Sequence, residues 1–131
     1  MKLVRLLGLS FVALGMVEVA WVVFCVVGGL LLGGLAAFGP KQPEMWLGLA
    51  GYWVLAAVNT PIAMLHLLAG FRLRRGRGLY TTMAAIAACM PAMLFALYCS
   101  PLVLPVMVFG IVVLILPDSR KVLDPFDEED F

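Results

Sequence analysis

A very long apolar segment occupies the first part of this chain. Between Leu6 and Phe38 the only charged side chain is that of Glu18. A straight helix over these residues would be about 50 Å long, whereas the hydrocarbon core of a bilayer is about 30 Å thick. The segment therefore predicts a membrane helix that tilts, extends beyond the membrane or breaks, with the glycine-rich residues 28–34 as its weakest section.

The composition of the whole chain agrees with a membrane protein. Its 131 residues are 64% hydrophobic and 13% charged, and their mean hydropathy is +1.09. A soluble domain is usually about half apolar and a quarter charged. We therefore expect one integral membrane domain, and the formal net charge of +1 gives no indication of a nucleic-acid partner.

Three more apolar segments follow the first one. The four segments are residues 6–38, 45–71, 79–99 and 100–117. The last segment reaches a spanning length only if Ser100 and Pro101 belong to it. Backbone groups in lipid must be paired within the structure, so each segment is expected to be a helix. The prediction is an all-α fold, a four-transmembrane-helix bundle over residues 1–117 with an acidic cytoplasmic tail at 118–131.

The basic residues predict the orientation of this bundle. A chain that crosses the membrane four times has Lys41 on one side and its other basic residues on the opposite side. These are Lys2, Arg5, Arg72, Arg74, Arg75, Arg77, Arg120 and Lys121. The positive-inside rule then places both termini in the cytoplasm, in a cytoplasmic (inner) membrane. Trp46 and Tyr98 would lie near the outer interface, and Tyr80 near the inner one.

The basic loop formed by Arg72, Arg74, Arg75 and Arg77 has more than one interpretation. It can act as a topology determinant that also meets anionic lipid headgroups, or as a docking surface for a soluble partner. The acidic residues 124–130 are on the same predicted side and can fold over these arginines or stay solvated.

Small residues in the first segment predict close helix packing. Cys25, Gly29, Gly33 and Ala37 recur at intervals of four, and Gly29 and Gly33 form a GxxxG motif. Small residues at this spacing let two helices approach closely. The partner helix can belong to the same chain or to a second copy in a homodimer.

The polar residues of the first two segments are candidates for an intramembrane contact. Glu18 shares a helix face with the small residues, and Asn59 and His66 share a face of the second segment. Glu18 and Asn59 are each 13 residues from a cytoplasmic arginine, Arg5 and Arg72, or about 20 Å along a helix, whereas His66 is about 9 Å in. This depth count predicts a Glu18–Asn59 hydrogen bond in which the carboxyl, lacking a cation, is largely neutral.

Catalytic and metal-binding motifs are not evident in the sequence. The cysteines at 25, 89 and 99 form no CxxC pair, and His66 is the only histidine. A zinc site or disulfide framework is therefore not expected. We found no nucleophile elbow, phosphate-binding loop or paired carboxylates, so the sequence predicts no enzyme, metal or cofactor.

Two resemblances to known families can be placed on specific residues. The stretch VEVAW, from Val17 to Trp21, resembles the first helix of the small multidrug resistance transporters. Those are four-helix proteins whose membrane glutamate binds protons and cationic substrates in an antiparallel dimer. This resemblance implies such a role for Glu18.

The second resemblance covers about the C-terminal half. HLLAGFRLRRGRGLYTTMAAIAA and PLVLPVMVFGIVVLILPDSRKVL are similar to segments of small bacterial four-span inner-membrane proteins of unknown function. It implies a multi-pass location and no activity. We therefore expect a non-enzymatic accessory or assembly subunit of a membrane complex, in contact with lipids and with other membrane subunits or a second copy. The alternative is a small proton-coupled transporter with Glu18 as its carrier carboxylate.

Overall fold

The computed structural model of the protein describes residues 2–39, 42–95 and 100–123. Those residues form helices joined by short turns, which confirms the predicted all-α class. The helices are α1 (Lys2–Phe38), α2 (Pro43–Arg74), α3 (Leu79–Phe95), α4 (Ser100–Ile115) and α5 (Pro117–Leu123). Tyr98, Cys99 and the acidic residues 124–130, which the sequence analysis assigned to a helix end and a tail, lie outside the described residues.

The first two helices form a long antiparallel hairpin. Helix α1 is continuous over 37 residues, about 55 Å, so the glycine-rich section does not break it. Pro43 begins α2, where its missing N–H costs nothing because the first N–H groups of a helix have no partner within it. At the other end of α2, Gly76 and Gly78 have positive φ angles of 71° and 111° and turn the chain into α3.

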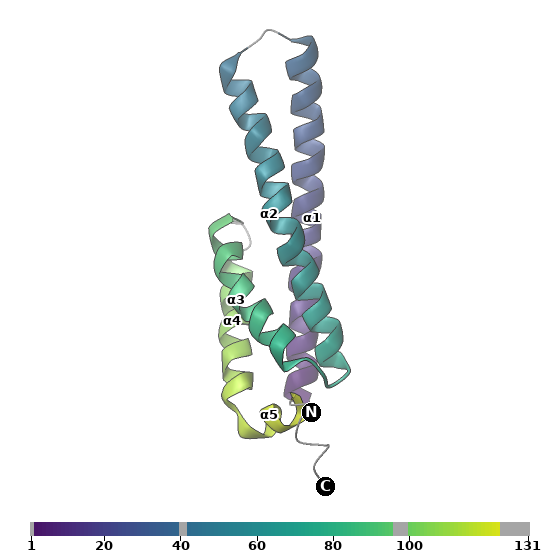
Figure 1. The fold of residues 1–131 in the computed structure, drawn as a ribbon, viewed down its shortest axis with the longest axis vertical. Coiled ribbons are helices and arrows are strands. Elements are labelled where there is room, and N and C mark those ends of the chain that lie inside the picture. Colours follow the sequence, from purple (N-terminus) through teal and green to yellow (C-terminus); the bar gives the residue numbers. More distant parts are fainter. Residues whose placement is uncertain (1, 40–41, 96–99, 124–131) are drawn as a thin grey trace.

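The remaining helices cover only part of this hairpin. Figure 1 shows α3 and α4 beside its lower half, ending well below the loop that joins α1 to α2. Helix α5 is bent by 89° from α4 and lies beneath the bundle, next to the start of α1. Residues 118–123, which were expected to begin a tail, therefore all belong to this helix, and its Ser119 and Leu123 are buried.

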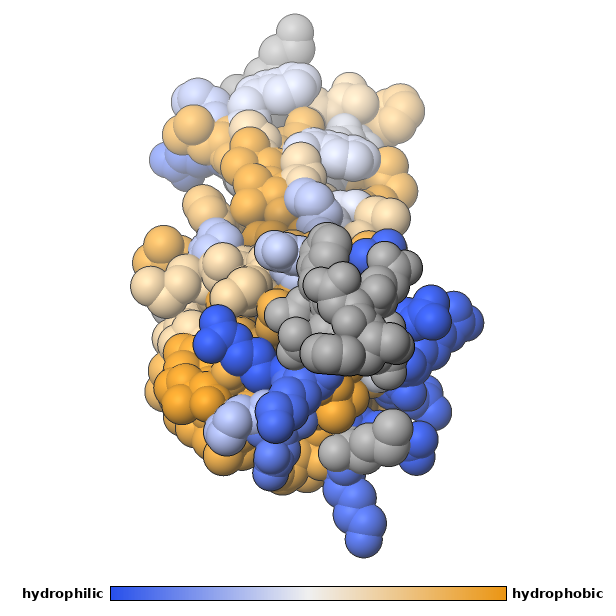
Figure 2. All heavy atoms as spheres, turned by 60° about the horizontal axis from the view of Figure 1, so that its bottom comes forward, coloured by the Kyte–Doolittle hydropathy of each residue, from blue (hydrophilic) through white to orange (hydrophobic). Residues whose placement is uncertain are grey.

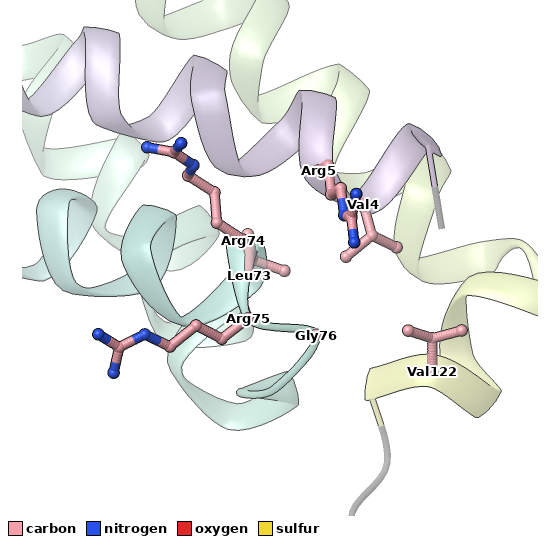
Figure 3. A pocket seen from close by; sticks show the side chains of 7 residues that line it. All are labelled: Val4, Arg5, Leu73, Arg74, Arg75, Gly76 and Val122. Carbon is pink, nitrogen blue, oxygen red and sulfur yellow. The ribbon is translucent and has the colours of Figure 1, made fainter.

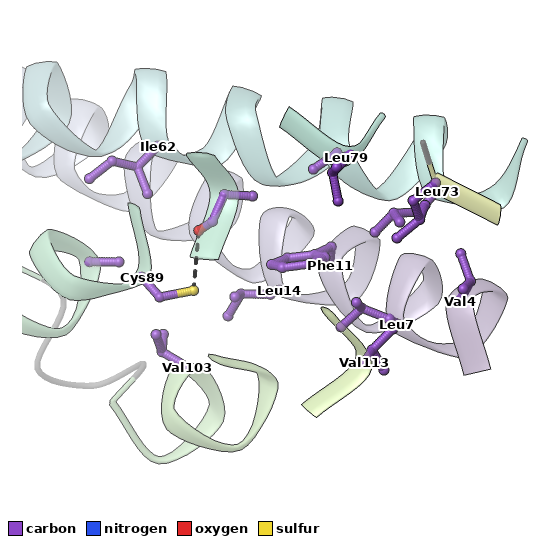
Figure 4. Close-up of a cluster of buried hydrophobic side chains, with 14 residues drawn as sticks. Val4, Leu7, Phe11, Leu14, Ile62, Leu73, Leu79, Cys89, Val103 and Val113 are labelled. Carbon is purple, nitrogen blue, oxygen red and sulfur yellow. Dashed lines mark hydrogen bonds between the residues drawn. The ribbon is translucent and has the colours of Figure 1, made fainter. Parts of the chain in front are cut away.

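The core of the protein lies in this lower half. Apolar side chains from all five helices meet there, among them Leu7, Phe11, Leu73, Leu79, Cys89, Val103, Val113 and Leu123 (Figure 4). Close van der Waals packing of these side chains helps to stabilise the bundle. Helices α3 and α4 are thereby held against the α1–α2 hairpin, and α5 closes the lower end of the bundle.

Among the described residues, two helices are long and apolar enough to cross a membrane, namely α1 and α2. A third candidate appears if the bent pair α4 and α5 is counted as one span, whereas α3, with 17 residues, is a shorter apolar helix. At 1.5 Å per residue α3 and α4 are each about 25 Å long. The two hairpins of the protein therefore differ about twofold in length.

The predicted ladder of small residues follows the contact between α1 and α2 for most of its length. Cys25 and Gly29 are buried, and Gly29 packs against Trp53 of α2. Ala37 differs from the prediction because it is exposed, while its neighbour Ala36 is buried. Each step of four residues advances 40° beyond a full helical turn, so a step of three is needed to return to the same face.

Candidate functional site

A polar cluster is buried where α1, α2 and α3 meet. Glu18 of α1 is 1% exposed, while His66 of α2 and Cys89 of α3 are both 0% exposed. The Nδ1 atom of His66 lies 2.7 Å from Oε2 of Glu18, and its Nε2 atom lies 2.9 Å from the carbonyl oxygen of Ala85. The Sγ atom of Cys89 is 3.5 Å from Nε2 and 3.4 Å from that same carbonyl. We call these four residues the Glu18–His66 cluster.

The register of the hairpin brings Glu18 towards His66. Gly8 packs against Gly70, and Gly15 packs against Leu67, so residues further along α1 face residues earlier in α2. Counted from these two contacts, Glu18 is level with residues 60–64 of α2, between Asn59 and His66. Helical side chains lean towards the N-terminus of their own helix, and in an antiparallel pair Glu18 and His66 therefore lean towards each other.

The predicted Glu18–Asn59 pair is wrong. Asn59 is buried, but its Nδ2 donates to the carbonyl oxygen of Leu55 in its own helix, at 2.8 Å. The depth count treated Arg5 and Arg72 as level, whereas Gly8, three residues after Arg5, already packs against Leu73 and Arg74. Asn59 also leans away from Glu18, for the same geometric reason that His66 leans towards it.

The hydrogen bonds of His66 define how many protons the cluster holds. A carbonyl oxygen can only accept, so the Nε2 atom that faces Ala85 carries a proton. A second proton lies between Nδ1 and Oε2, either on the ring as an ion pair or on the carboxyl as a neutral pair. Removing it would leave two acceptors facing each other at 2.7 Å. With this proton in place, the pair carries no net charge.

Apolar side chains enclose the cluster. The ring of Phe11 stacks on the imidazole of His66, with ring centroids 5.6 Å apart and an interplanar angle of 18°. Leu14 lies next to Phe11 and Cys89 in the same core (Figure 4). A hydrogen bond in such surroundings is electrostatically stronger than one in water, and a polar group that loses its partner there is costly.

Some polar capacity in this region remains unused. Within the part of the chain that the structure describes, Oε1 of Glu18 and Oδ1 of Asn59 are buried and have no hydrogen-bond partner. Buried carboxyl and amide oxygens usually have at least one partner. Within the cluster, Glu18 is therefore the residue that keeps a buried acceptor without a partner among the described residues.

The order of groups in the cluster resembles that of a covalent catalyst. Cys89, His66 and Glu18 stand in the order of nucleophile, base and orienting carboxylate. The thiol is fully buried, however, and the Nε2 proton of His66 is already directed to the carbonyl of Ala85, so His66 is not arranged to take the thiol proton.

Over residues 2–39, 42–95 and 100–123 no group of three or more His, Cys, Asp or Glu side chains could hold a metal ion. The geometry is that of a polar link between three helices.

Cys89, Ala85 and Phe11 were not predicted as members of this site. The sequence excluded Cys89 only from a zinc site or disulfide framework, and the structure places it in the core. Its contact with His66 joins residues 23 positions apart on different helices. No spacing rule within a single helix carries that information, so only the packing of α3 against α2 reveals it.

The four arginines of the predicted basic loop are exposed at the end of α2 and in the turn that follows it. Arg72 caps this end, because its carbonyl oxygen accepts bonds from the backbone N–H groups of Arg75 and Arg77, at 3.0 and 3.1 Å. Arg74 and Arg75 also line a hollow that includes Arg5 of α1. The structure thus brings the N-terminal basic residue and part of the loop together.

Comparisons of the chain with protein-family models, with curated proteins and with solved structures find no match.

Proposed function

We propose that this protein is a non-enzymatic, multi-pass protein of the inner membrane that acts as an accessory or assembly subunit of a membrane complex. In this proposal α1, α2, α3 and α4 cross the membrane, and α5 lies along its cytoplasmic surface. Both termini and the turn between α2 and α3 are then cytoplasmic.

The distribution of charge supports this placement. Lys2 and Arg5 begin α1, the arginines of the basic loop end α2, and Arg120 and Lys121 lie in α5. Figure 2 shows hydrophilic side chains gathered at the end of the molecule that includes α5, next to a largely apolar surface. Basic residues concentrate on the cytoplasmic side of membrane proteins, so this end faces the cytoplasm.

The observation that carries the subunit proposal is the bare upper half of the α1–α2 hairpin. The apolar residues 6–38 of α1 extend about 50 Å, and a tilt of 40°, near the upper limit for membrane helices, still leaves about 38 Å along the membrane normal. Helices α3 and α4 do not reach this section (Figure 1). Leu31 and Phe38 are 66% and 94% exposed there. An apolar surface longer than the bilayer calls for protein cover.

Two glycines in this upper section face open space. A Cβ atom added to Gly34 of α1 or to Gly51 of α2 would meet no atom within 4 Å. Small residues on an open helix face allow a further helix to approach closely. A partner subunit packed on this section would explain why neither position carries a side chain.

The experiment that tests the proposal compares two exposed leucines of α1. A photo-reactive amino acid at Leu31, in the upper section, is expected to give one stoichiometric protein adduct in native membranes. The same group at Leu9, which is exposed in the lower half, is expected to give lipid adducts only. Gly34→Ile and Gly51→Ile should weaken the Leu31 adduct at least about fivefold, because overpacking of a helix contact costs roughly 1–3 kcal/mol.

The glycine variants keep this test specific. Because no described residue from elsewhere in the chain comes within 4 Å of either Cβ position, both substitutions should leave the thermal stability of the purified protein unchanged. Equal protein adducts at Leu31 and Leu9, or an adduct at Leu31 that tolerates both isoleucines, would refute the subunit proposal.

A proton-coupled transporter is the second candidate function, and one observation favours it. Glu18 shares a proton with His66 and retains a buried oxygen that accepts no bond within the described residues. A carrier carboxylate must exchange this proton for a cation. The purified protein would then release protons when a hydrophobic cation binds, and Glu18→Gln would abolish the release. An apolar groove between α1 and α4 is lined by Ser10, Ala13, Leu14, Val17, Leu102 and Val106. Glu18 does not line this groove.

A further inference from the structure

One side of α2 is uncovered along most of the helix. We call it the outer face of α2, and its residues recur at intervals of three and four, which places them on one side of a helix. All of them are exposed: Leu47, Ala50, Val54, Ala57, Pro61 and Met64. Buried residues of α2, among them Asn59, His66 and Gly70, lie on the opposite side, towards α1 and α3. A further helix therefore has access to the outer face without displacing a contact that the structure describes.

Small residues make the outer face suited to a close helix contact. Ala50 and Ala57 present only a methyl group. Gly51 borders the face, and no atom from elsewhere in the described chain lies within 4 Å of its Cβ position. Small residues at a contact let two membrane helices approach closely. Such an approach brings the partner within reach of the backbone of α2.

The backbone of the outer face contains a carbonyl group that lacks its helical donor. The carbonyl of Ala57 would accept from the N–H of residue 61, but Pro61 has no N–H. The nearby hydroxyl of Thr60 donates to the carbonyl of Ala56 instead, at 2.7 Å. A hydroxyl has a single proton, so Thr60 does not replace the lost donor.

The charged end of α2 is a separate surface, far from this carbonyl. There the side chains of Arg74 and Arg75 extend away from Arg5 and from the hollow between α1, α2 and α5 (Figure 3). Ala57 lies 15 residues before Arg72, about 22 Å along the helix. In the membrane placement proposed above, its carbonyl is therefore within the hydrocarbon core, which is about 30 Å thick and contains no water to pair with it.

We propose that a transmembrane helix of the partner subunit packs on the outer face of α2 and donates a side-chain hydrogen bond to the carbonyl of Ala57. The donor is a hydroxyl or amide group, from Ser, Thr, Asn or Gln. Neighbouring helices commonly satisfy the backbone groups that a proline frees within a membrane. The inference rests on the function proposed above, to which it adds a surface on α2 and the chemistry of the partner.

A second copy of this chain matches the outer face less well than a different protein does. At the level of Ala57 its own outer face offers the hydroxyl of Thr60, whose proton is already donated within its helix. The amide of Asn59 is buried on the other side of α2 and donates to Leu55. Lipid acyl chains carry no donor at all. A different protein therefore supplies the hydrogen bond.

The test places a photo-reactive amino acid at Val54, an exposed residue of the outer face, in native membranes. We expect a protein adduct whose linked peptide, sequenced by mass spectrometry, is an apolar segment with a Ser, Thr, Asn or Gln within one turn of the linked residue. Ala57→Leu should reduce the adduct at least about fivefold, because the larger side chain prevents close approach. Pro61→Ala returns an N–H to the carbonyl of Ala57 and should reduce the adduct about threefold, because the bond from the partner is then replaced.

Two controls separate the hydrogen bond from a change in helix shape. Pro91→Ala in α3 restores an N–H to the carbonyl of Ala87 in the same way and should leave the Val54 adduct unchanged. Alanine in place of the partner's Ser, Thr, Asn or Gln should cost about threefold with the native chain and nothing further with Pro61→Ala.

Several outcomes would overturn the inference. Lipid adducts alone at Val54, with a protein adduct retained at Leu31, would show a partner that does not cover α2 and would leave the subunit proposal standing. An adduct between two copies of this chain would assign the outer face to a homodimer. Loss of the adduct in Ala57→Leu but not in Pro61→Ala would indicate a packed helix without the hydrogen bond. Absence of protein adducts at both Val54 and Leu31 would refute the subunit proposal as well.

Discussion

At the scale of single residues, a carboxyl group within an apolar helix needs a neighbour with which it can share a proton. His66 meets this need from α2, and the carbonyl of Ala85 in turn orients its ring. Glu18 thereby links three helices, since its partner also contacts Cys89 of α3. The charge that stood out in the sequence is accounted for by this link, whatever further role it has.

The first prediction concerns the strength of the Glu18–His66 pair. In a double-mutant cycle of Glu18→Leu and His66→Leu, the two substitutions should be coupled by about 1–2 kcal/mol in the free energy of unfolding, in the upper range for polar contacts between membrane helices. Each single variant leaves a buried polar group without its partner, whereas the double variant removes both. Unfolding in mixed detergent micelles measures the effect.

Asn59→Leu provides the control for this cycle. Asn59 bonds to Leu55 of its own helix, so its substitution should add to that of Glu18 within about 0.5 kcal/mol. Coupling of Glu18 to Asn59 that equals its coupling to His66 would contradict the described contact.

At the scale of elements, the register between α1 and α2 is defined by backbone contact at glycines. A Cβ atom on Gly70 would lie 2.8 Å from the carbonyl oxygen of Gly8 and 2.9 Å from the backbone nitrogen of Val12. Backbone atoms cannot move aside as side chains do. The lower half of the hairpin therefore depends on these two glycines, and the placement of Glu18 opposite His66 depends on the same contact.

The second prediction tests this contact. Gly70→Ala should lower the free energy of unfolding by about 1–3 kcal/mol, because the added methyl group forces the two helices apart. Gly51→Ala in the same helix is the matched control, since no atom lies within 4 Å of its Cβ position. That control should be neutral or stabilise the isolated chain by up to about 1 kcal/mol, as helix propensity predicts. Equal effects of both substitutions in chemical unfolding would contradict the described packing.

The third prediction concerns α5. Leu123 is buried in the core, and its truncation to alanine should cost about 2–3 kcal/mol and release the helix. Ile115→Ala, at an exposed position at the end of α4, should cost less than about 0.5 kcal/mol. Limited proteolysis after α4, followed over time, distinguishes a docked helix from a released one. Cleavage at equal rates in both variants would argue against docking of α5.

At the scale of the whole molecule, the two hairpins differ in length. The pair α3 and α4 is about 25 Å long and the pair α1 and α2 about twice that, so the protein has a compact lower half and a bare upper half. Charge is concentrated at the lower end (Figure 2). In the function proposed above, the compact lower half lies in the membrane and the bare upper half contacts a partner subunit.

The fourth prediction tests the proposed topology. Single cysteines replace Lys2, Gln42, Arg77 and Arg120 in a chain whose native cysteines are alanine, and intact cells are treated with a membrane-impermeant maleimide. With four crossings, only the cysteine at position 42 should be labelled before lysis, because basic segments stay on the cytoplasmic side. Labelling at position 120 but not at position 77 would instead indicate three crossings.

The local pattern of the sequence determined the helices and the general position of Glu18. Hydropathy and turn residues depend only on neighbouring positions, so the all-α class could be derived from them, as could the face that Glu18 shares with Cys25 and Gly29. The one-sided distribution of basic residues is likewise visible without a structure.

The tertiary structure alone decided which residue Glu18 contacts and how the helices differ in reach. A shift of about one helical turn between α1 and α2, together with the lean of each side chain towards the N-terminus of its own helix, exchanges Asn59 for His66. The shift follows from contacts between the two helices, such as those at Gly8 and Gly15, rather than from a count along a single helix. The return of α5 beneath the bundle and the approach of Cys89 to His66 also depend on contacts between distant segments. Packing between helices, unlike helix formation, is a property of several segments at once.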